Sequence, residues 1–427
     1  MLTKTLLILI ALIGLSVPVA AALGWLGLTL QYFDSPMPLY RAIGDIFWQN
    51  GTDFLLVAIP MFILLGEILL RSGITEKMYD GMSHWLGWLP GGLMHSNIGS
   101  SALFAATSGS SVATAATIGT VAISQVEKRG YNERLFLGTI AAGGTLGILI
   151  PPSINLILYG VLTDTSVPEL YLAGFIPGLL LALLFMLSVI IACLVFRKWG
   201  GEAVGSSFKE KVRSLPGLIP PLAIFVVVVG SIYTGFATPT EAASLGVVAA
   251  FILAYFNKAL SLDMVREAVE GTMRTTAMIM LIILAAIFLN FVLSVIGLTE
   301  QLSSFINDLN WSPLQTMLMI IAFYIVLGCF METLSMLLTT APLITPIVVG
   351  LGYDPVWFGI LLMVLLETAL ITPPIGINLY VVQGVRGRGP MSDVMAGVLP
   401  FIISMFVMIG LLIAFPEIAL WAPSLFY

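Results

Sequence analysis

Apolar segments long enough to span a membrane, separated by short polar stretches, dominate the hydropathy pattern. Residues 5–33, 52–70, 171–196 and 275–297 contain almost no charge. Several of these segments exceed the ~20 residues that a helix needs to cross ~30 Å of hydrocarbon. The first is predicted to be a membrane helix rather than a secretory signal, because similar segments follow it throughout the chain. The predicted crossings are residues 5–33, 52–71, 135–165, 167–196, 215–237, 240–257, 275–297, 356–385 and 395–421.

Two further apolar regions, residues 90–126 and 312–349, have small or polar residues at their middle. Each region is long enough to enter a membrane and return. Non-helical backbone at membrane depth is tolerated only where protein or a water-filled cavity surrounds it. The pattern therefore predicts two re-entrant helical hairpins.

Two amphipathic stretches, residues 39–48 and 262–269, occupy equivalent places relative to these hairpins. One face of each stretch is apolar and the other is charged or polar. This pattern predicts helices that lie along the membrane surface.

The basic residues test this layout, because cytoplasmic loops retain Lys and Arg. With the N-terminus in the cytoplasm, the crossings place all 17 Lys and Arg residues except Arg41 on the cytoplasmic side. The sequence thus predicts a cytoplasmic N-terminus and a periplasmic C-terminus. The first hairpin then enters from the cytoplasm and the second from the periplasm.

Composition excludes an ordinary soluble protein. Of the 427 residues, 59% are hydrophobic and 9% are charged, whereas roughly a quarter are charged in soluble domains. No basic patch with interleaved aromatic residues suggests a nucleic-acid partner, and the lipid bilayer is the expected surrounding. Cys193 and Cys329 lie in apolar segments without C-x-x-C spacing, so neither a disulfide nor a metal site is indicated.

The chain contains an internal repeat. The segment GYNERLFLGTIAAGGTLGILIPPSINLILYG, from Gly130, resembles GYDPVWFGILLMVLLETALITPPIGINLYVV, from Gly352. The Pro-Pro pairs that start at Pro151 and Pro373 are 222 positions apart. Shorter matches on either side keep the same order along the chain, which chance similarity between apolar segments does not explain.

An odd number of predicted crossings separates the two copies, so they have opposite orientations in the bilayer. We predict an all-α polytopic membrane protein built as an inverted repeat, with two re-entrant hairpins and two broken helices. Inverted repeats place the solute and the coupling ion near the midplane, at the repeat interface. The first repeat is predicted at residues 1–196, with a hairpin at 90–126 and a broken helix at 135–165. A basic cytoplasmic loop and a linking helix are predicted at 197–237. The second repeat is predicted at 238–427, with a hairpin at 312–349 and a broken helix at 356–385.

The tip of the first hairpin, residues Thr107–Ser111, has the sequence TSGSS. One interpretation is close packing, because small residues let membrane helices approach and hydroxyls bond across helices. The other is a site where carbonyl and hydroxyl oxygens coordinate Na⁺, a hard cation that prefers oxygen ligands. Five consecutive non-apolar residues exceed what close packing needs, and this favours the cation site.

The two Pro-Pro pairs predict broken helices at Gly143–Ser153 and Glu367–Gly376. Proline lacks the N–H donor and pushes the preceding residue out of helical geometry. A break frees carbonyls for a cation and exposes a helix N-terminus, whose positive dipole end suits a carboxylate. A simple proline kink is the alternative, but breaks in both halves favour a function.

The second hairpin tip contains a carboxylate, Glu332. Carboxylates at membrane depth are costly without partners and are functional candidates by default. Glu332 is expected to balance Na⁺ or to accept hydrogen bonds from the solute. Structural roles are expected for Glu67 and Glu241, whereas Glu367 is a stronger candidate because it lies beside the second break.

No sequence motif for catalysis or nucleotide binding competes with this interpretation. The chain lacks H-E-x-x-H, a G-K-S/T phosphate loop and a serine nucleophile motif. It is therefore not expected to be an enzyme, and an ion gradient is the expected energy source.

The segments SGSSVATAATIG, IPPSINLILYG, YTGFATPTEAA and ETALITPPIGINL together resemble the large membrane subunit of TRAP (tripartite ATP-independent periplasmic) transporters, of the DctM or SiaM type. The resemblance covers nearly the whole chain. It implies an elevator-type transporter of a bacterial inner membrane, driven by Na⁺. It also implies two partners, a small four-helix membrane subunit of the DctQ or SiaQ type and a periplasmic substrate-binding protein. The implied solute is an organic acid, either sialic acid or a C4-dicarboxylate.

The resemblance also implies where the ions and the solute bind. Solute-binding residues would be Ser108, Ser153 and Glu332, facing one cavity between the hairpins. The Na⁺ sites would be formed at the two tips and the two breaks by Ser108, Gly109, Ser110, Gly147 and Pro151, and by Thr333, Thr339, Glu367, Thr368 and Thr372.

Two alternative functions stay open. A stand-alone Na⁺/organic anion symporter with the same plan would need no binding protein. An intramembrane enzyme or an assembly scaffold belongs to a different class, and would not require the hydroxyls at the hairpin tips.

Overall fold

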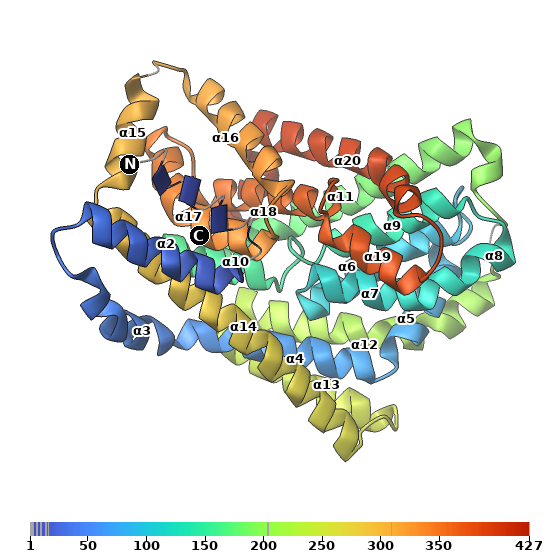
Figure 1. Cartoon of the computed structure of the whole chain (residues 1–427). Helices are drawn as coiled ribbons and strands as arrows, with labels where there is room; N and C mark the ends of the chain where they lie inside the picture. The colour runs from blue at the N-terminus through green and yellow to red at the C-terminus, as the bar shows by residue number, and fades with distance from the viewer. Residues whose placement is uncertain are drawn as a thin grey trace.

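The computed structural model describes residues 4–5, 7–8, 11–12, 15, 17–202, 205–308 and 310–426. Within these ranges the chain folds into helices and contains no strand. The predicted all-α class is therefore confirmed. Figure 1 shows the helices packed side by side, with α2 and α15 at one end of the molecule and α8 at the other.

The first half of the chain forms one hairpin and one broken helix. Helices α6 and α7 are the arms of the hairpin, with Gly109 and Ser110 at its tip. Helices α9 and α10 are the two parts of the broken helix. The helices of this half are α2 (Val19–Asp34), α3 (Ile43–Gly51), α4 (Ala58–Arg71), α5 (Ile74–Leu86), α6 (Leu93–Ser108), α7 (Ser111–Ala122), α8 (Val126–Arg129), α9 (Glu133–Thr145), α10 (Ile154–Thr163) and α11 (Val167–Val195).

The second half repeats this plan. Helices α16 and α17 form the second hairpin, and α18 and α19 are the two parts of the second broken helix. Both Pro-Pro bonds, Pro151–Pro152 and Pro373–Pro374, are cis. The helices are α12 (Phe208–Tyr233), which links the halves, and α13 (Pro239–Phe256), α14 (Leu262–Val295), α15 (Leu298–Asp308), α16 (Pro313–Gly328), α17 (Thr333–Gly350), α18 (Pro355–Ile371), α19 (Ile377–Arg386), α20 (Met391–Ala414) and α21 (Glu417–Leu420).

Seven helical segments of the described chain are long and apolar enough to cross a membrane. The shorter apolar helices α10, α16 and α18 belong to the broken helices and the hairpins. The chain is therefore a multi-pass membrane protein. The seven segments are Phe54–Arg71, Val167–Val195, Phe208–Tyr233, Pro239–Phe256, Leu262–Val295, Thr333–Gly350 and Met391–Ala414.

The N-terminal segment differs from the predicted single crossing at residues 5–33, whose first part lies largely outside the described residues. Lys4 Nζ is 2.9 Å from Asp34 Oδ2, at the far end of α2. The chain therefore turns back before α2, whose N-cap is Pro18. The single crossing predicted for residues 5–33 is therefore wrong in this structure, because Lys4 and Asp34 lie together. The cytoplasmic N-terminus stays a prediction.

The amphipathic stretch 262–269 also differs from its prediction. It is the first part of α14, which continues without interruption to Val295. No proline occurs between these residues, so nothing ends the helix at the membrane surface. The stretch at 39–48 does form separate short elements, a 3₁₀ turn (Leu39–Ala42) followed by α3.

Side-chain caps fix several helix starts. Asn132 and Ser312 each accept a hydrogen bond from a backbone N–H in the first turn of α9 and α16. Thr238 does the same for α13, where Glu241 Oε2 accepts the Thr238 N–H at 2.8 Å. This reciprocal pair is a capping box, and it agrees with the structural role expected for Glu241.

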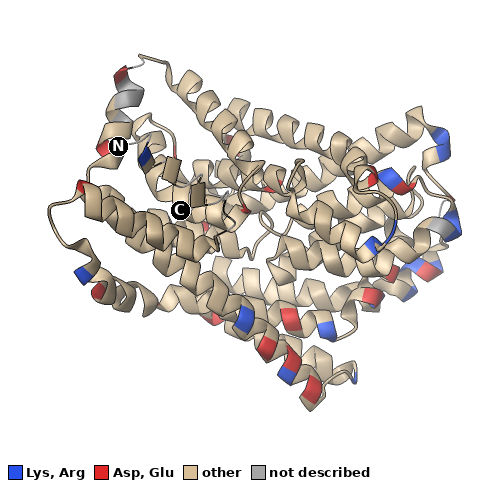
Figure 2. Cartoon of the chain, viewed as in Figure 1, with Lys and Arg blue, Asp and Glu red and all other residues tan. Residues whose placement is uncertain are grey.

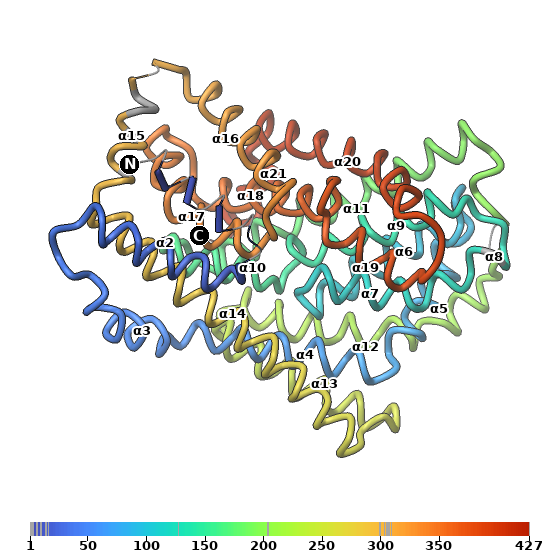
Figure 3. The backbone as a smooth tube through the Cα atoms, viewed as in Figure 1, coloured from blue at the N-terminus to red at the C-terminus, as the bar shows by residue number. Residues whose placement is uncertain are grey.

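Elements of the two halves pack against each other in a symmetric way. Helix α9 lies against α20, and α11 lies against α18; Figure 3 traces these helices along the length of the molecule. The second arm of each hairpin contacts the other half: α7 packs against α19, and α17 packs against α10. The exact repeat boundaries at residues 196 and 238 stay a prediction.

Candidate functional site

A cavity of about 410 Å³ lies where the two hairpin tips and the two broken helices meet. Helices α4 and α14 form its other wall. Its lining residues from the tips are Ser108, Gly109, Ser110, Ser111, Val112, Ala113, Ala116, Glu332, Thr333 and Leu334, from the broken helices Ile148, Ile154, Asn155, Leu370 and Ile377, and from the wall Ile63, Gly66, Glu67, Leu70, Thr275, Met278 and Ile279.

The first hairpin tip is built for close contact with the first break. Gly109 has φ +59°, in the left-handed region that favours glycine. A Cβ atom at Gly109 would lie 2.7 Å from the carbonyl oxygen of Pro152. On the other side of the tip, Ser110 caps α7. The TSGSS sequence thus allows the tip to touch the Pro-Pro backbone directly.

The backbone of the first broken helix also contacts this hairpin tip. A Cβ atom at Gly147 would lie 2.8 Å from the Ser110 carbonyl carbon. Ser111 Oγ donates to the Thr145 carbonyl at 3.3 Å. Ser153 begins α10 without a side-chain cap, and its hydroxyl is fully buried and makes no hydrogen bond in the described chain. Oxygen atoms from two elements are therefore concentrated around Ser110, Pro152 and Ser153.

The second tip is organised by Glu332, which caps α17. Its carboxylate accepts the backbone N–H groups of Leu334 and Ser335, each at 3.0 Å. The hydroxyls of Thr333 and Ser335 donate to it at 3.2 and 3.1 Å. The half-buried carboxylate lines the cavity, and the helix N-terminus stabilises its negative charge.

The threonines of the second half bond within their own helices. The Oγ1 atoms of Thr339, Thr368 and Thr372 donate to carbonyls four residues earlier, at 2.6, 2.7 and 2.6 Å. A hydroxyl that donates in this way keeps its lone pairs for another group. None of the three lines the cavity.

Glu367 is the most deeply buried carboxyl group of the described chain. Its residue is 0% exposed, and no side chain of the described chain forms a hydrogen bond with its carboxyl oxygens. It projects from α18 toward the backbone of Leu149, in the first break. A residue of the second half thus meets the broken helix of the first.

The structure brings some predicted residues to the cavity and not others. Ser108, Gly109, Ser110, Glu332 and Thr333 line it. Ser153, predicted to face the same cavity, lies behind the lining and is fully buried. The remaining predicted residues are also outside the lining: Gly147, Pro151, Thr339, Glu367, Thr368 and Thr372.

Asn155 lines the cavity and was missed by the sequence analysis. It is the second residue of α10, just after the first break. Its counterpart after the second break is Asn378, whose Nδ2 instead donates to the Ala141 carbonyl at 3.1 Å. The shared I-N-L sequence after both Pro-Pro pairs was the available signal.

The wall opposite the tips contains an ion-pair group that joins α4 and α14. Arg71 forms an ion pair with Glu67 on the same helix and with Glu267 on α14, the latter at 3.3 Å. Gly271 of α14 leaves space for the Glu67 carboxylate, because a Cβ atom there would lie 2.9 Å from it. Glu67 therefore has the structural partner expected for it, and it also lines the cavity.

Two polar-tipped hairpins that face two broken helices across a central cavity are typical of membrane transporters built from inverted repeats. The match to a family model identifies which transporters these are. Residues 6–418 match the tripartite ATP-independent periplasmic transporter, DctM component. The chain belongs to this family, and the predicted TRAP large-subunit resemblance is confirmed.

Known relatives are similar over most of this chain. The chain is 34% identical to the C4-dicarboxylate TRAP transporter large permease protein DctM of Pseudomonas aeruginosa, over 90% of each chain. It is 32% identical to the sialic acid TRAP transporter large permease protein SiaM of Vibrio cholerae, over 96% of this chain and 99% of that protein. The isethionate TRAP transporter permease protein DctMQ of Oleidesulfovibrio alaskensis is 31% identical, and the match covers 64% of that longer chain. These relatives are permease proteins, which confirms that the chain is a transport protein rather than an enzyme.

A solved structure shares the fold. The YdaH transporter of Alcanivorax borkumensis, described as having an unusual topology, superposes with a TM-score of 0.66 and 16% identity. The superposition covers 97% of this chain and 99% of that one. At this identity the similarity concerns the fold alone.

Proposed function

We propose that this TRAP large permease takes up an organic acid anion together with Na⁺, by moving a solute-loaded unit across the bilayer. The observation that carries this proposal is the single cavity at which both hairpin tips and both broken helices meet. A site built from both halves suits alternating access, because exchanging the roles of the halves opens it to either side.

The charge of the cavity supports coupling to a cation. Its lining contains Glu67 and Glu332 and, among the described residues, no Lys, Arg or His. Arg71 offsets the charge of Glu67 from behind the lining. An organic anion that entered this cavity alone would meet a net negative charge. Bound Na⁺ would reverse that balance, and oxygen atoms are the ligands it prefers.

The Na⁺ ligands that we propose are at the tips and the breaks. For the first site they are Ser108, Gly109 and Ser110, with the backbone at Gly147 and Pro151. For the second they are Thr333, Thr339, Glu367, Thr368 and Thr372. Support comes from the buried oxygens of Glu367 and the contact of Gly109 with Pro152, which concentrate oxygen atoms with few partners.

The proposed solute is a C4-dicarboxylate or sialic acid, as the names of the relatives suggest. Ser108, Glu332 and Asn155 are the polar groups that would contact it in the cavity, with Ser153 behind them. The amide of Asn155 stands at the N-terminus of α10, whose positive dipole end favours a carboxylate. Glu332 would accept hydrogen bonds from solute hydroxyls.

The unit that moves would consist of the hairpins and the broken helices, and α4 and α14 would belong to the fixed wall. Helix α4 packs against the first hairpin and α14 against the second. The ion pairs of Arg71 hold α4 and α14 together. This division corresponds to an elevator mechanism.

The proposed setting is a bacterial inner membrane, with the basic loops in the cytoplasm and the C-terminus in the periplasm. Figure 2 shows Lys and Arg gathered toward the end of the molecule that contains α8 and the start of α12. The proposed partners are a small four-helix subunit and a periplasmic binding protein. A longer relative named DctMQ supports a close association with a small membrane subunit.

Uptake by cells that contain the complete system tests Na⁺ coupling. Thr333→Val removes the hydroxyl at the second tip while keeping side-chain shape, and is expected to raise the Na⁺ concentration for half-maximal uptake about tenfold. Thr120→Val is the matched control, because Thr120 is exposed on α7 and its hydroxyl bonds only within the helix. Uptake that is independent of Na⁺, or equal effects of the two variants, would contradict the proposal.

Liposomes distinguish the stand-alone symporter from the tripartite system. The purified chain alone is expected to show no uptake under a Na⁺ gradient, and uptake should appear when the small subunit and the loaded binding protein are added. Full uptake by the chain alone would favour the stand-alone symporter.

A further inference from the structure

A second cavity is a groove that shares no lining residue with the cavity between the hairpin tips. It has a volume of about 860 Å³ and lies between the last turns of α11, the first half of α20 and the start of α9. The Ser188–Ser404 hydrogen bond, at 2.6 Å, closes one end of it.

The walls of the groove are apolar along the membrane-spanning parts of α11 and α20. The lining includes Ile191 and Val195 on α11, Phe196 directly after it, and Leu399 and Ile403 on α20, all at least half exposed. Along α20 the groove reaches from Asp393 to Ile403. At 1.5 Å per residue this is about 15 Å, close to the thickness of one leaflet of the hydrocarbon core.

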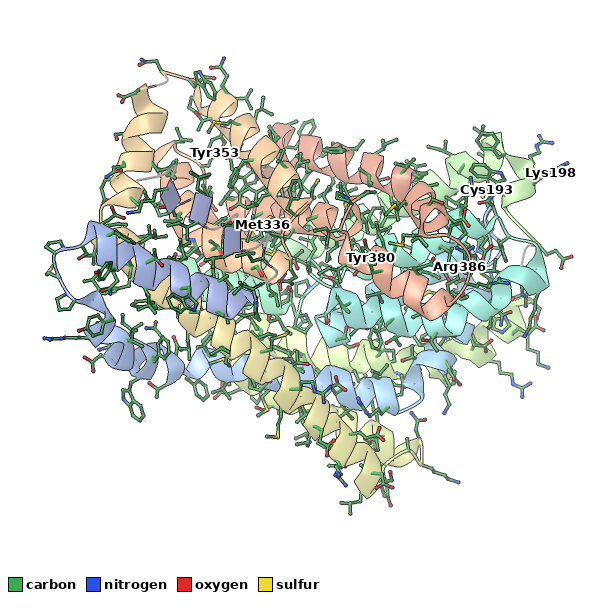
Figure 4. All side chains as sticks on the ribbon, in the orientation of Figure 1. Cys193, Lys198, Met336, Tyr353, Tyr380 and Arg386 are labelled. Atoms are coloured by element: carbon green, nitrogen blue, oxygen red, sulfur yellow. The ribbon has the colours of Figure 1, made fainter. Side chains whose placement is uncertain are left out.

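The other end of the groove is charged. Glu133, Arg134 and Asp393 line it there. Behind them lies Arg386, whose buried guanidinium bonds Glu133 Oε1 at 2.9 Å and Asp393 Oδ2 at 3.1 Å. Figure 4 labels Arg386 near Cys193 and Lys198, at the same end of the molecule as the last turn of α11.

The charged end contains both positive and negative side chains that are partly exposed. Arg134 bonds Asp393 through Nε alone, at 2.9 Å, and its side chain is 63% exposed. The terminal guanidinium nitrogens of Arg134 make no hydrogen bond in the described chain. The Glu133 side chain is 33% exposed at the opposite side of Arg386. An exposed cation and a partly exposed carboxylate thus stand together at the head of an apolar groove.

Two aromatic residues lie beside the charged end of the groove. Phe196 and Trp199 stack with ring centroids 4.3 Å apart, and both line the groove. Aromatic side chains gather where the hydrocarbon meets the headgroups. The charged end therefore lies at headgroup depth, and the apolar walls extend into the acyl-chain region.

We propose that the groove is a specific binding site for a phospholipid whose headgroup has both a phosphate and a primary ammonium, such as phosphatidylethanolamine. The phosphate would bind the terminal nitrogens of Arg134, which suit bidentate contact with phosphate oxygens. The ammonium would donate to Glu133, and the acyl chains would fill the apolar walls. Arg388, whose side chain is 49% exposed, also bonds Glu133 Oε1 at 3.3 Å, so Arg134, Arg386 and Arg388 surround the two carboxylates at this end.

The headgroup requirement is tested with the purified full chain in mixed micelles. Phosphatidylethanolamine, phosphatidylcholine and phosphatidylglycerol with identical acyl chains are titrated, and retained lipid is counted by native mass spectrometry. Phosphatidylethanolamine is expected to bind about tenfold more tightly than either other lipid, because only its headgroup offers both charged hydrogen bonds. Equal binding of the three lipids would overturn the proposal.

Two variants locate the site. Ala192→Phe places a ring in the groove and is expected to abolish the preference for phosphatidylethanolamine. Leu194→Phe is the matched control, because Leu194 is exposed on the same helix and does not line the groove. Arg134→Gln removes the proposed phosphate ligand and leaves the apolar walls in place, and is expected to weaken phosphatidylethanolamine binding about tenfold.

A preference that survives Ala192→Phe would place the lipid elsewhere and overturn the assignment. A protein occupant is a further outcome of the test. If Ala192→Phe released a second membrane subunit while the three lipids bound equally, the groove would be a protein-docking site and the proposal would be wrong.

Discussion

Gly109 is the residue at which the first hairpin touches the first broken helix. Gly109→Ala is expected to displace the tip, because its Cβ atom would lie 2.7 Å from the Pro152 carbonyl oxygen. We expect Na⁺-dependent uptake to fall on the order of tenfold, since small displacements of a positioned site have effects of that size or larger. Uptake at several Na⁺ concentrations measures this.

Gly130→Ala provides the control for backbone strain. Gly130 has φ +65°, close to the φ of Gly109, but a Cβ atom there has nothing within 4 Å. Both variants therefore lose about 1–2 kcal/mol of stability by placing alanine in the left-handed region. Only Gly109→Ala also brings a Cβ atom too close to the Pro152 carbonyl oxygen. Equal uptake by the two variants would show that the tip contact is unimportant.

The sequence places Ser108, Ser110, Glu332 and Thr333 at the hairpin tips, because small and charged residues interrupt apolar segments there. In the structure these residues line the cavity, and their binding roles stay a prediction. Ser153 was harder to place, because its burial behind the lining depends on how the first break packs against the hairpin tip. The repeated I-N-L sequence was a signal for Asn155, whereas Glu67 lines the cavity only because distant helices pack together, which one sequence does not show.

At the scale of elements, hydropathy located the hairpins and the broken helices because the bilayer requires long apolar segments. It failed at residues 5–33, where uniform apolar character conceals the turn before Pro18 and the contact of Lys4 with Asp34. Hydropathy also predicted residues 262–269 as a separate surface helix. These residues are the charged first part of the 34-residue helix α14, and the rest of that helix is apolar.

The ion pairs of Arg386 connect three elements, α9, α19 and α20. Arg386→Gln is expected to lower the midpoint of thermal unfolding by several degrees, because Glu133 and Asp393 would lose a partner whose side chain is only 3% exposed. Fluorescence-detected unfolding of the purified chain measures the midpoint.

Arg266→Gln is the corresponding surface control. Arg266 pairs with Glu270 one turn away, and its side chain is 77% exposed. Exposed pairs of this kind contribute little, so the midpoint should not change. Equal midpoints for the Arg386 and Arg266 variants would show that the buried pairs do not hold the three helices together.

At the scale of the whole molecule, the two halves meet along α9 and α20. A Cβ atom on either Gly138 or Gly397 would overlap the backbone of the opposite helix. Small residues permit this close approach, as in other membrane helix pairs. The repeat was visible in the sequence, but the pairing of its copies was not.

The orientation of the chain is tested with an impermeant maleimide, after Cys193 and Cys329 are replaced by serine. Lys4→Cys and Arg41→Cys are expected to react in intact cells, because Lys4 lies beside Asp34 near the loop that contains Arg41. Lys128→Cys should react only after permeabilisation, since it lies in a basic loop. A Lys4→Cys variant that reacts only in permeabilised cells would support the single crossing instead.

The acidic lining of the cavity constrains the sequence of loading. If the solute is an organic anion, as proposed above, the carboxylates of Glu67 and Glu332 in the lining would repel it until Na⁺ has bound. Na⁺ should therefore enter first and the organic acid second. A transporter without bound Na⁺ would then not bind the organic acid, and so would not let it flow out of the cell down the concentration gradient of the acid.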